Sequence, residues 1–235
     1  MKQNSEIKVE DMNVSPTCGK PLVMGSTVFN EDCMTVMARY PDKYFDLAIV
    51  DPPYGIDLAN MNMGAGNKPK HCNNKRRGFT AKDWDKNPPE SEYFVELKRV
   101  SKNQIIWGGN YFDLGTCYGF CIWDKGSPDG MSFSDCEFAW HSFRKVAKLF
   151  KYSTYLNKGD KIHPTQKPVA LYDWLLMNYA KQNDLILDTH VGSGSSRIAA
   201  NKNGFEFIGC EIDVEYFEAQ EARFKDFTSQ LRLFG

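Results

Sequence analysis

The chain has 235 residues, of which 42% are hydrophobic and 25% are charged, and its formal net charge is −1. This length suits one domain, and the composition excludes collagen-like, coiled-coil and wholly disordered proteins. No apolar run reaches the roughly 18 residues that a membrane span needs. Residues 1–10 also lack the apolar core of a secretory signal. Because the net charge is small, any binding of nucleic acid must depend on local basic patches.

The cysteines favour a reduced, cytoplasmic setting. Seven of them occur with no regular spacing, in a chain whose start does not resemble a signal. One group with spacing near that of a zinc finger comprises Cys117, Cys121, Cys136 and His141. These residues lie in or beside expected strands, so we expect small buried thiols there and no metal site.

The hydrophobic pattern indicates a parallel α/β layout. Residues 1–22 are polar without periodicity and are expected to form a tail, so that the domain spans 23–235. Helices are expected at 31–40 with Asn30 as N-cap, 90–100, 168–180, 195–203 and 214–233. Strands are expected at 44–50, 104–107, 119–123, 136–141, 184–188 and 205–211. The strand–helix–strand–helix order of the last fifty residues is typical of a parallel sheet.

A Gly/Ser loop follows the expected strand at 184–188. In open α/β sheets, ligands bind beyond the carboxyl ends of the strands. Asp188 lies at such an end, and Gly192 and Gly194 follow it, where the missing side chains let a ligand approach the backbone. Glu211 closes the next strand, and a carboxylate at that position is suited to bind two ribose hydroxyls.

The same loop disfavours two common ligands. Arg197 stands where the dinucleotide fingerprint needs a third glycine, and no Gly-Lys-Ser/Thr run of a P-loop occurs. A nucleoside without an essential pyrophosphate remains, and S-adenosylmethionine (AdoMet) fits, with a ribose for Glu211 and an amino-acid end for the glycine loop. The alternative is that the loop merely joins a strand to a helix, because a lone Gly-x-Gly pattern is weak.

The run Asp51-Pro52-Pro53-Tyr54 directly follows the expected buried strand at 44–50. Neither proline has an N–H, and Pro53 forces Pro52 into extended geometry. The Pro52 carbonyl and the Asp51 carboxylate therefore offer two acceptors to one amino group, and Asp51 opposes positive charge that develops on its nitrogen. Tyr54 can stack on a base flipped out of a duplex. The alternative is a rigid turn with Tyr54 in the core.

Five segments in order resemble the amino-group DNA methyltransferases of the permuted β type, in which the catalytic motif precedes the AdoMet motif. These segments are FDLAIVDPPYGI (45–56), QIIWGGNYF (104–112), HPTQKP (163–168), DTHVGSGSS (188–196) and FIGCEID (207–213). The resemblance implies an α/β fold with a doubly wound, mostly parallel Rossmann-like sheet. It also implies AdoMet as cofactor and double-stranded DNA as partner.

The resemblance further implies methyl transfer to the N6 amine of adenine, because an Asp at the first motif position is associated with adenine enzymes. A cytosine-N4 enzyme is the alternative within the class, and a catalytically silent DNA-binding protein is the alternative outside it. A homodimer and a restriction endonuclease partner are left open.

Carried over residue by residue, the resemblance assigns two groups of site residues. The catalytic residues are Asp51, Pro52, Pro53 and Tyr54. The cofactor-binding residues are Asp32, Thr165, Lys167, Asp188, Gly192, Gly194, Ser195 and Glu211. Thr165 and Lys167 are expected near the methionine end of AdoMet, and Asp32 near its adenine. Thr189 and His190 depart from the family, which usually has Pro-Phe there.

Two basic stretches, at 58–85 and 142–162, are the candidate DNA-contacting insertions. The residues expected to bind DNA are Lys68, Lys70, Lys75, Arg76, Arg77, Lys148 and Lys151. Phosphate contacts of this kind give affinity that is independent of sequence and sensitive to salt. The first stretch follows the catalytic motif closely and can reach the strand whose base is flipped. The alternative is a pair of solvated loops.

Overall fold

The computed structural model describes residues 25–56, 87–127, 134–153, 162–163 and 165–233. The expected tail at 1–22 and the basic stretch at 58–85 lie outside these residues, as does part of the second basic stretch. No helix in the described ranges is long and apolar enough to cross a membrane.

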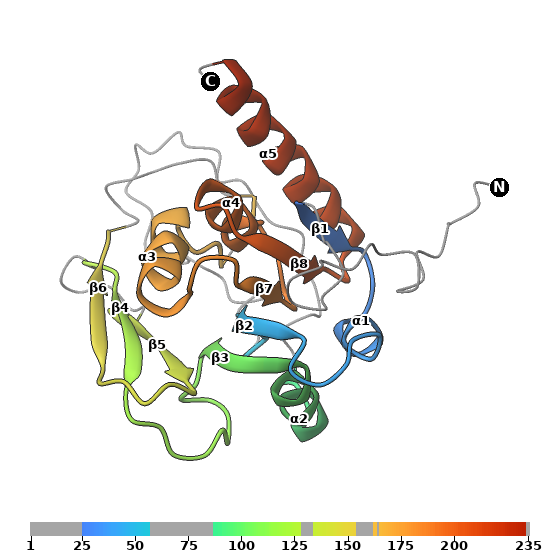
Figure 1. The fold of residues 1–235 in the computed structure, drawn as a ribbon. Coiled ribbons are helices and arrows are strands. Elements are labelled where there is room, and N and C mark those ends of the chain that lie inside the picture. The colour runs from blue at the N-terminus through green and yellow to red at the C-terminus, as the bar shows by residue number, and fades with distance from the viewer. Residues whose placement is uncertain (1–24, 57–86, 128–133, 154–161, 164, 234–235) are drawn as a thin grey trace, which may run out of the picture.

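One sheet runs through the described part of the chain, with strands in the order β1-β8-β7-β2-β3-β5-β4-β6 (Figure 1). The strands are β1 Ser26–Phe29, β2 Phe45–Val50, β3 Ser101–Trp107, β4 Phe120–Asp124, β5 Cys136–His141, β6 Lys148–Lys151, β7 Leu185–Asp188 and β8 Glu206–Cys210. The first five strands in the sheet order are parallel neighbours. β5 is antiparallel to both β3 and β4, and β6 is parallel to β4. This mostly parallel sheet confirms the predicted fold class.

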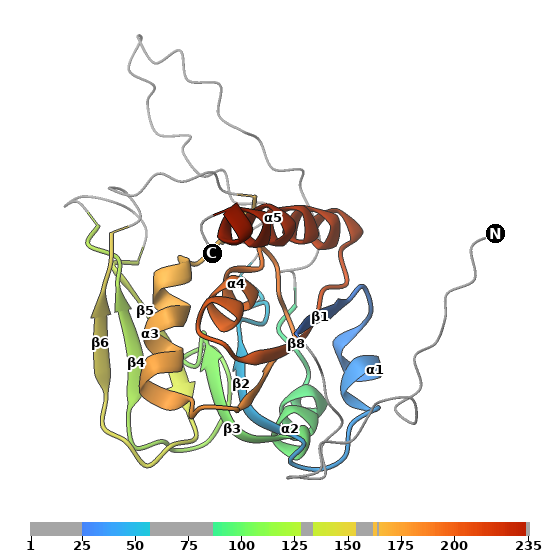
Figure 2. The same ribbon diagram turned by 45° about the horizontal axis from the view of Figure 1, so that its top comes forward.

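Helices cover both faces of the sheet (Figures 1 and 2). They are α1 Cys33–Met37, α2 Ser91–Val100, α3 Val169–Tyr179, α4 Ser195–Lys202 and α5 Val214–Leu233. Phe45 and Ala48 of β2 belong to the core beneath α1 and α2, whereas Leu47 and Ile49 belong to the core beneath α3 and α4. Because both faces of β2 are buried, its sequence is a nearly continuous apolar run rather than an alternating one.

The predicted N-cap of the first helix is wrong. Asp32, not Asn30, caps α1, because its carboxylate accepts hydrogen bonds from the N–H groups of Met34 (3.0 Å) and Thr35 (3.1 Å). The Asn30 side chain instead donates to the carbonyl of Glu211 over 2.8 Å. Asn30 therefore connects the end of β1 to the end of β8.

Two observed strands were not expected from the sequence. β1 is a four-residue strand at one edge of the sheet, and β6 is a four-residue strand at the other. β6 lies within the second basic stretch, which was expected to be a DNA-contacting insertion. The described part of that stretch is thus partly a sheet edge.

The direction of the strands gathers chemically useful residues at one edge of the sheet. Asp51 directly follows β2, Asp188 ends β7, and Glu211 directly follows β8, so all three lie at the carboxyl edge of the parallel strands. β5 runs the opposite way and therefore begins at that edge. Its second residue, Glu137, pairs with Trp123 near the end of β4.

Candidate active site

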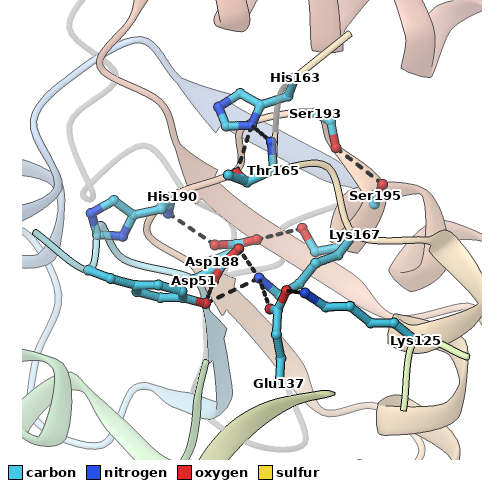
Figure 3. Close-up of polar contacts among 12 residues, drawn as sticks. Asp51, Lys125, Glu137, His163, Thr165, Lys167, Asp188, His190, Ser193 and Ser195 are labelled. Atoms are coloured by element: carbon cyan, nitrogen blue, oxygen red, sulfur yellow. Dashed lines mark hydrogen bonds and ion pairs between the residues drawn. The ribbon is translucent and has the colours of Figure 1, made fainter. Parts of the chain in front are cut away.

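The Asp51 carboxylate has a partner on each oxygen (Figure 3). The Tyr54 hydroxyl donates to Oδ1 over 2.6 Å, and the Lys167 ammonium forms an ion pair with Oδ2. Burial raises the pKa of Asp51 above its usual value, while the Lys167 charge and the two hydrogen bonds oppose that rise. The motif after β2 therefore places a partly buried carboxylate, with a partner on each oxygen, at the sheet edge.

The Tyr54 ring is held by a close approach to the backbone. Gly108, directly after β3, has φ +69°, and a Cβ built there would lie 2.3 Å from an atom of the Tyr54 ring. The ring also stacks on Tyr111, with centroids 5.0 Å apart and an interplanar angle of 18°. Tyr111 is half exposed, at 48%. The Tyr54 ring thus already has an aromatic neighbour that was not predicted.

Lys167 joins Asp51 to a second carboxylate, that of Glu137. The Lys167 side chain is 3% exposed, and its Nζ lies 3.2 Å from Glu137 Oε2. Lys125 pairs with the other Glu137 oxygen over 2.8 Å. Burial lowers the pKa of Lys167, but the charges of Asp51 and Glu137 outweigh burial and hold it above its usual value. Glu137 was not predicted as a site residue; its only signal in the sequence is that of an acid in an otherwise mostly apolar strand.

Asp188 organises the glycine loop through both of its oxygens. Oδ1 accepts the His190 N–H over 3.0 Å, and Oδ2 accepts the Ser196 hydroxyl over 2.5 Å. Asp188 is 1% exposed. Burial raises its pKa to about 7, although these two hydrogen bonds favour the charged form. Asp188 therefore connects the end of β7 to the first turn of α4.

Glu211 fixes the other side of the same loop. Its Oε2 accepts the Gly192 N–H over 2.8 Å, and its Oε1 accepts the Asp213 N–H over 2.9 Å. Burial raises the pKa of Glu211. Gly192 has φ +51° and Gly194 has φ +73°, so both adopt the left-handed backbone that favours glycine. Each Glu211 oxygen can accept a further hydrogen bond from a ligand.

The segment before α3 closes the site from a third side. The Thr165 hydroxyl lies 3.0 Å from His163 Nδ1, and the His163 ring lies 4.3 Å from the Tyr216 ring, centroid to centroid. A Cβ built on Gly192 would lie 3.7 Å from the His163 ring. His163 and Tyr216 were not predicted as site residues.

These segments enclose a cavity of about 210 Å³. The predicted residues that line it are Asp51, Pro53, Thr165, Lys167, Gly192 and Glu211. The cavity thus brings the motif after β2 together with the loop after β7. Its unpredicted lining residues are His163, Gln166, Tyr172, His190, Val191, Ser193, Ile212 and Tyr216.

The other predicted site residues lie outside the cavity lining. Pro52 is buried, Gly194 is the N-cap residue of α4, and Asp32 caps α1. The Ser195 hydroxyl lies 3.2 Å from the Ser193 hydroxyl and accepts from Arg223 over 3.0 Å. These positions are consistent with support of the loop, and their contact with a cofactor stays a prediction.

The cavity has the chemistry that AdoMet requires. A partly buried carboxylate with unused acceptor capacity, that of Glu211, suits ribose hydroxyls, and Gly192 leaves room for a ligand against the backbone. Asp51 provides negative charge at the same cavity. Among the residues that the structure describes, no group of three or more His, Cys, Asp or Glu is arranged to hold a metal ion.

Only two of the predicted DNA-binding residues are described, and both lie on β6. The Lys148 ammonium donates to the Asn178 side chain over 2.6 Å, near the end of α3 that is farther from the cavity. Lys151 ends β6 and lies 3.7 Å from Asp124. Because β6 is parallel to β4, Lys151 lies at the same edge of the sheet as the cavity, whereas Lys148 lies toward the opposite edge. Lys68, Lys70, Lys75, Arg76 and Arg77 lie outside the described residues.

Comparison with known proteins bears on the chemistry of this cavity. Residues 106–222 match the model of a family described as DNA methylase, which covers N6-adenine and N4-cytosine enzymes. The chain is also 26% identical over 254 residues to the Type II methyltransferase M2.MboI of Moraxella bovis, a match that covers 87% of this chain and 89% of the relative. These matches support an amino-group DNA methyltransferase. The methylase family uses AdoMet, in agreement with the predicted cofactor.

Two solved structures share the fold. The M1.HpyAVI–SAM complex has a TM-score of 0.56 and 20% identity, over 84% of this chain and 98% of that one. The PvuII DNA methyltransferase, described as cytosine-N4-specific, has a TM-score of 0.56 and 15% identity, over 87% of this chain and 90% of that one. The chain therefore shares the fold of these two proteins, one of which was solved as a complex with SAM. Because one of these structures is a cytosine-N4 enzyme, the methyltransferase fold does not separate adenine from cytosine.

Proposed function

We propose that the chain is a site-specific, AdoMet-dependent DNA methyltransferase that acts on the exocyclic N6 amine of adenine. The observation that supports this proposal is the shared cavity, which is lined both by Asp51 and Pro53 and by Gly192 and Glu211. A reaction between a target amine and a cofactor methyl group requires that the two binding elements face one another.

The cofactor is held by the loop after β7 and its neighbours. Glu211 binds the ribose hydroxyls, Gly192 lets the ligand approach the backbone, and Thr165 lies toward the amino-acid end. When bound, AdoMet supplies the methyl group of its sulfonium to the target nitrogen. The hydrogen bond between Gly192 and Glu211 pre-organises this side of the cavity, because the acceptor is already oriented before the ligand arrives.

The target amine is held by Asp51 and Pro52. It donates one hydrogen to the Asp51 carboxylate and the other to the Pro52 carbonyl. Pro52 and Pro53 have no backbone N–H that could compete for these two acceptors. Asp51 is required in its charged form, and Lys167 and Tyr54 favour that form against burial. The nitrogen gains a methyl group and loses one proton, which passes to Asp51 or water. Tyr54 contributes a ring on which the flipped base stacks.

Adenine is favoured over cytosine by Asp51 at the first position of the catalytic motif, through the association noted above. Mass spectrometry of nucleosides from duplex DNA treated with the protein and AdoMet distinguishes the two bases. We expect N6-methyladenine alone. N4-methylcytosine alone would replace the adenine assignment but keep the reaction class.

A catalytically silent protein is the other candidate, because Thr189 and His190 depart from the usual family pair. These residues form an ordered network in which Thr189 Oγ1 lies 2.7 Å from the Tyr93 hydroxyl and 2.9 Å from His190 Nδ1. Calorimetry with AdoMet tests this candidate, since failure to bind at millimolar ligand would support it.

We also propose double-stranded DNA as the partner and the cytoplasm as the location. The basic stretch at 58–85 is proposed to contact DNA phosphates, together with Lys151 at the cavity edge of the sheet. A salt titration of DNA binding tests these contacts, because replacing a phosphate-binding lysine should reduce the slope of log affinity against log salt by about one.

A further inference from the structure

Four charged side chains form a continuous row beside the cavity: Lys125, Glu137, Lys167 and Asp51 (Figure 3). Lys125 binds one Glu137 oxygen, and Lys167 lies between the other Glu137 oxygen and Asp51. The row holds two positive and two negative charges, so its net charge is zero. Burial of an unpaired charge at this site would cost free energy. Glu137 has no assigned part in the proposed reaction.

The pairing of Asp51 conflicts with its proposed task. Lys167 occupies Oδ2 and Tyr54 occupies Oδ1, whereas the target amine must also donate to this carboxylate. A carboxylate oxygen accepts more than one hydrogen bond, but an ammonium in direct contact with Oδ2 competes for the space that the amine needs. The amine therefore binds best when Lys167 moves away from Asp51.

We propose that Glu137 is a positioning residue. When the target amine enters, the Lys167 ammonium moves from Asp51 to Glu137, which leaves Asp51 Oδ2 free to accept from the amine. This inference rests on the proposed methyltransferase function. Lys167 Nζ is already 3.2 Å from Glu137 Oε2, and that oxygen is buried. A small displacement of the flexible lysine side chain thus exchanges one carboxylate for the other while the ammonium stays paired.

The surroundings of Glu137 suit this exchange. The residue belongs to β5 and pairs with Trp123 of β4, so the sheet fixes its backbone on that side. Lys125 holds its Oε1, which leaves Oε2 directed toward Lys167. The Lys167 ammonium also lies 5.4 Å from the centre of the Trp107 ring, which stabilises a cation independently of Asp51. Without Glu137, a Lys167 that left Asp51 would be a buried and largely unpaired charge. The ammonium would therefore remain paired with Asp51.

The test compares the full-length wild-type chain with Glu137→Gln and Glu137→Asp. Initial rates of duplex DNA methylation are measured across a pH series, and AdoMet affinity is measured by calorimetry. Glu96→Gln is the matched control, because Glu96 pairs with Arg99 on α2 over 2.7 Å and does not line the cavity. Thermal unfolding of each variant verifies that it is folded.

We expect Glu137→Gln to lower kcat by roughly 10-fold or more, as for loss of a positioning group, and to leave AdoMet affinity within about twofold. The acidic limb of the rate profile should move to lower pH, because Glu137 raises the pKa of Asp51. The other ionisable groups that face Asp51 are unchanged in this variant: Lys167, Tyr54, Tyr172 and Asp188. Glu137→Asp retains the charge, so it should keep part of the wild-type rate and should leave the acidic limb of the rate profile at the wild-type pH.

Several outcomes would overturn the inference. One is a methylation rate of Glu137→Gln equal to that of the wild type. The others are a lower rate in that variant with the acidic limb of its rate profile at the wild-type pH, and a lower rate that weaker AdoMet binding explains. If Glu137→Gln fails to fold, the aspartate variant decides, since a full loss of rate in a folded Glu137→Asp would also contradict the exchange. A wild-type protein that methylates no DNA would instead refute the proposed function.

Discussion

The backbone N–H of Gly192 donates a hydrogen bond to Glu211 Oε2 over 2.8 Å, and this bond joins the loop after β7 to the end of β8. Glu211 is thus both an anchor for the loop and the proposed acceptor for the ribose. Glu211→Ala removes both contributions, and hydrogen bonds to a charged group are each worth about 1.5–3 kcal/mol. We expect the Kd for AdoMet to rise by roughly 10-fold or more.

Calorimetry measures this change, with Glu218→Ala as the control because Glu218 is an exposed acid on α5. Unchanged AdoMet affinity in Glu211→Ala, with the control also unchanged, would remove Glu211 from the cofactor site.

Replacement of Tyr54 tests base stacking. Tyr54→Ala should weaken capture of the flipped base by roughly 1–3 kcal/mol, whereas Tyr54→Trp keeps a stacking surface and should lose less. A fluorescent 2-aminopurine at the target position reports capture directly. Since Tyr111 stacks on the Tyr54 ring, Tyr111→Ala is measured beside them. Equal losses in the alanine and tryptophan variants of Tyr54 would argue against stacking.

Gly108→Ala should displace the Tyr54 ring. The new Cβ would lie 2.3 Å from that ring, at a residue whose φ of +69° already disfavours side chains. We expect lower thermal stability, by about 1 kcal/mol or more, together with a lower methylation rate. Gly204→Ala is a suitable control, because Gly204 has φ +73° but nothing within 4 Å of the added Cβ. Equal losses of methylation in the two variants would show that backbone strain, not the Tyr54 ring, is responsible.

Asp188 predicts a dependence of stability on pH. Its pKa in the folded protein is about 7, above the ordinary value of 3.8 that we expect in the unfolded chain. The folded state therefore binds the proton of Asp188 more tightly than the unfolded chain does. The contribution of Asp188 to the free energy of unfolding is complete below the pKa of the unfolded chain, and it is lost as the pH rises through the pKa of the folded protein. Thermal unfolding of wild type and Asp188→Asn between pH 4 and about 8 should show the wild type losing Tm relative to the variant as pH rises. A difference that stays constant over this range would contradict the raised pKa.

The parts of the fold that could be predicted are those with a local signal. β2 is apolar throughout because both of its faces are buried, and the two prolines after Asp51 mark its end. The Gly/Ser loop before α4 is marked by residues with positive φ, Gly192 and Gly194. Periodicity and turn residues therefore located both halves of the candidate site.

The parts that were missed have no local signal. β1 and β6 are four-residue edge strands, and β6 is mostly exposed, so neither shows a buried pattern. The contact between Lys167 and Glu137 depends on β5 running antiparallel, which brings residues from distant parts of the chain to one edge of the sheet. A strand's direction in the sheet cannot be deduced from its own residues.

Asp51→Ala tests directly whether this carboxylate holds the target amine beside the cofactor. Duplex DNA treated with AdoMet and either protein is digested to nucleosides and analysed by mass spectrometry, and AdoMet affinity is measured on the same samples. We expect N6-methyladenine with the wild-type chain and a rate lower by about 10²-fold or more with Asp51→Ala, at similar AdoMet affinity. Methylation by Asp51→Ala at the wild-type rate would contradict it.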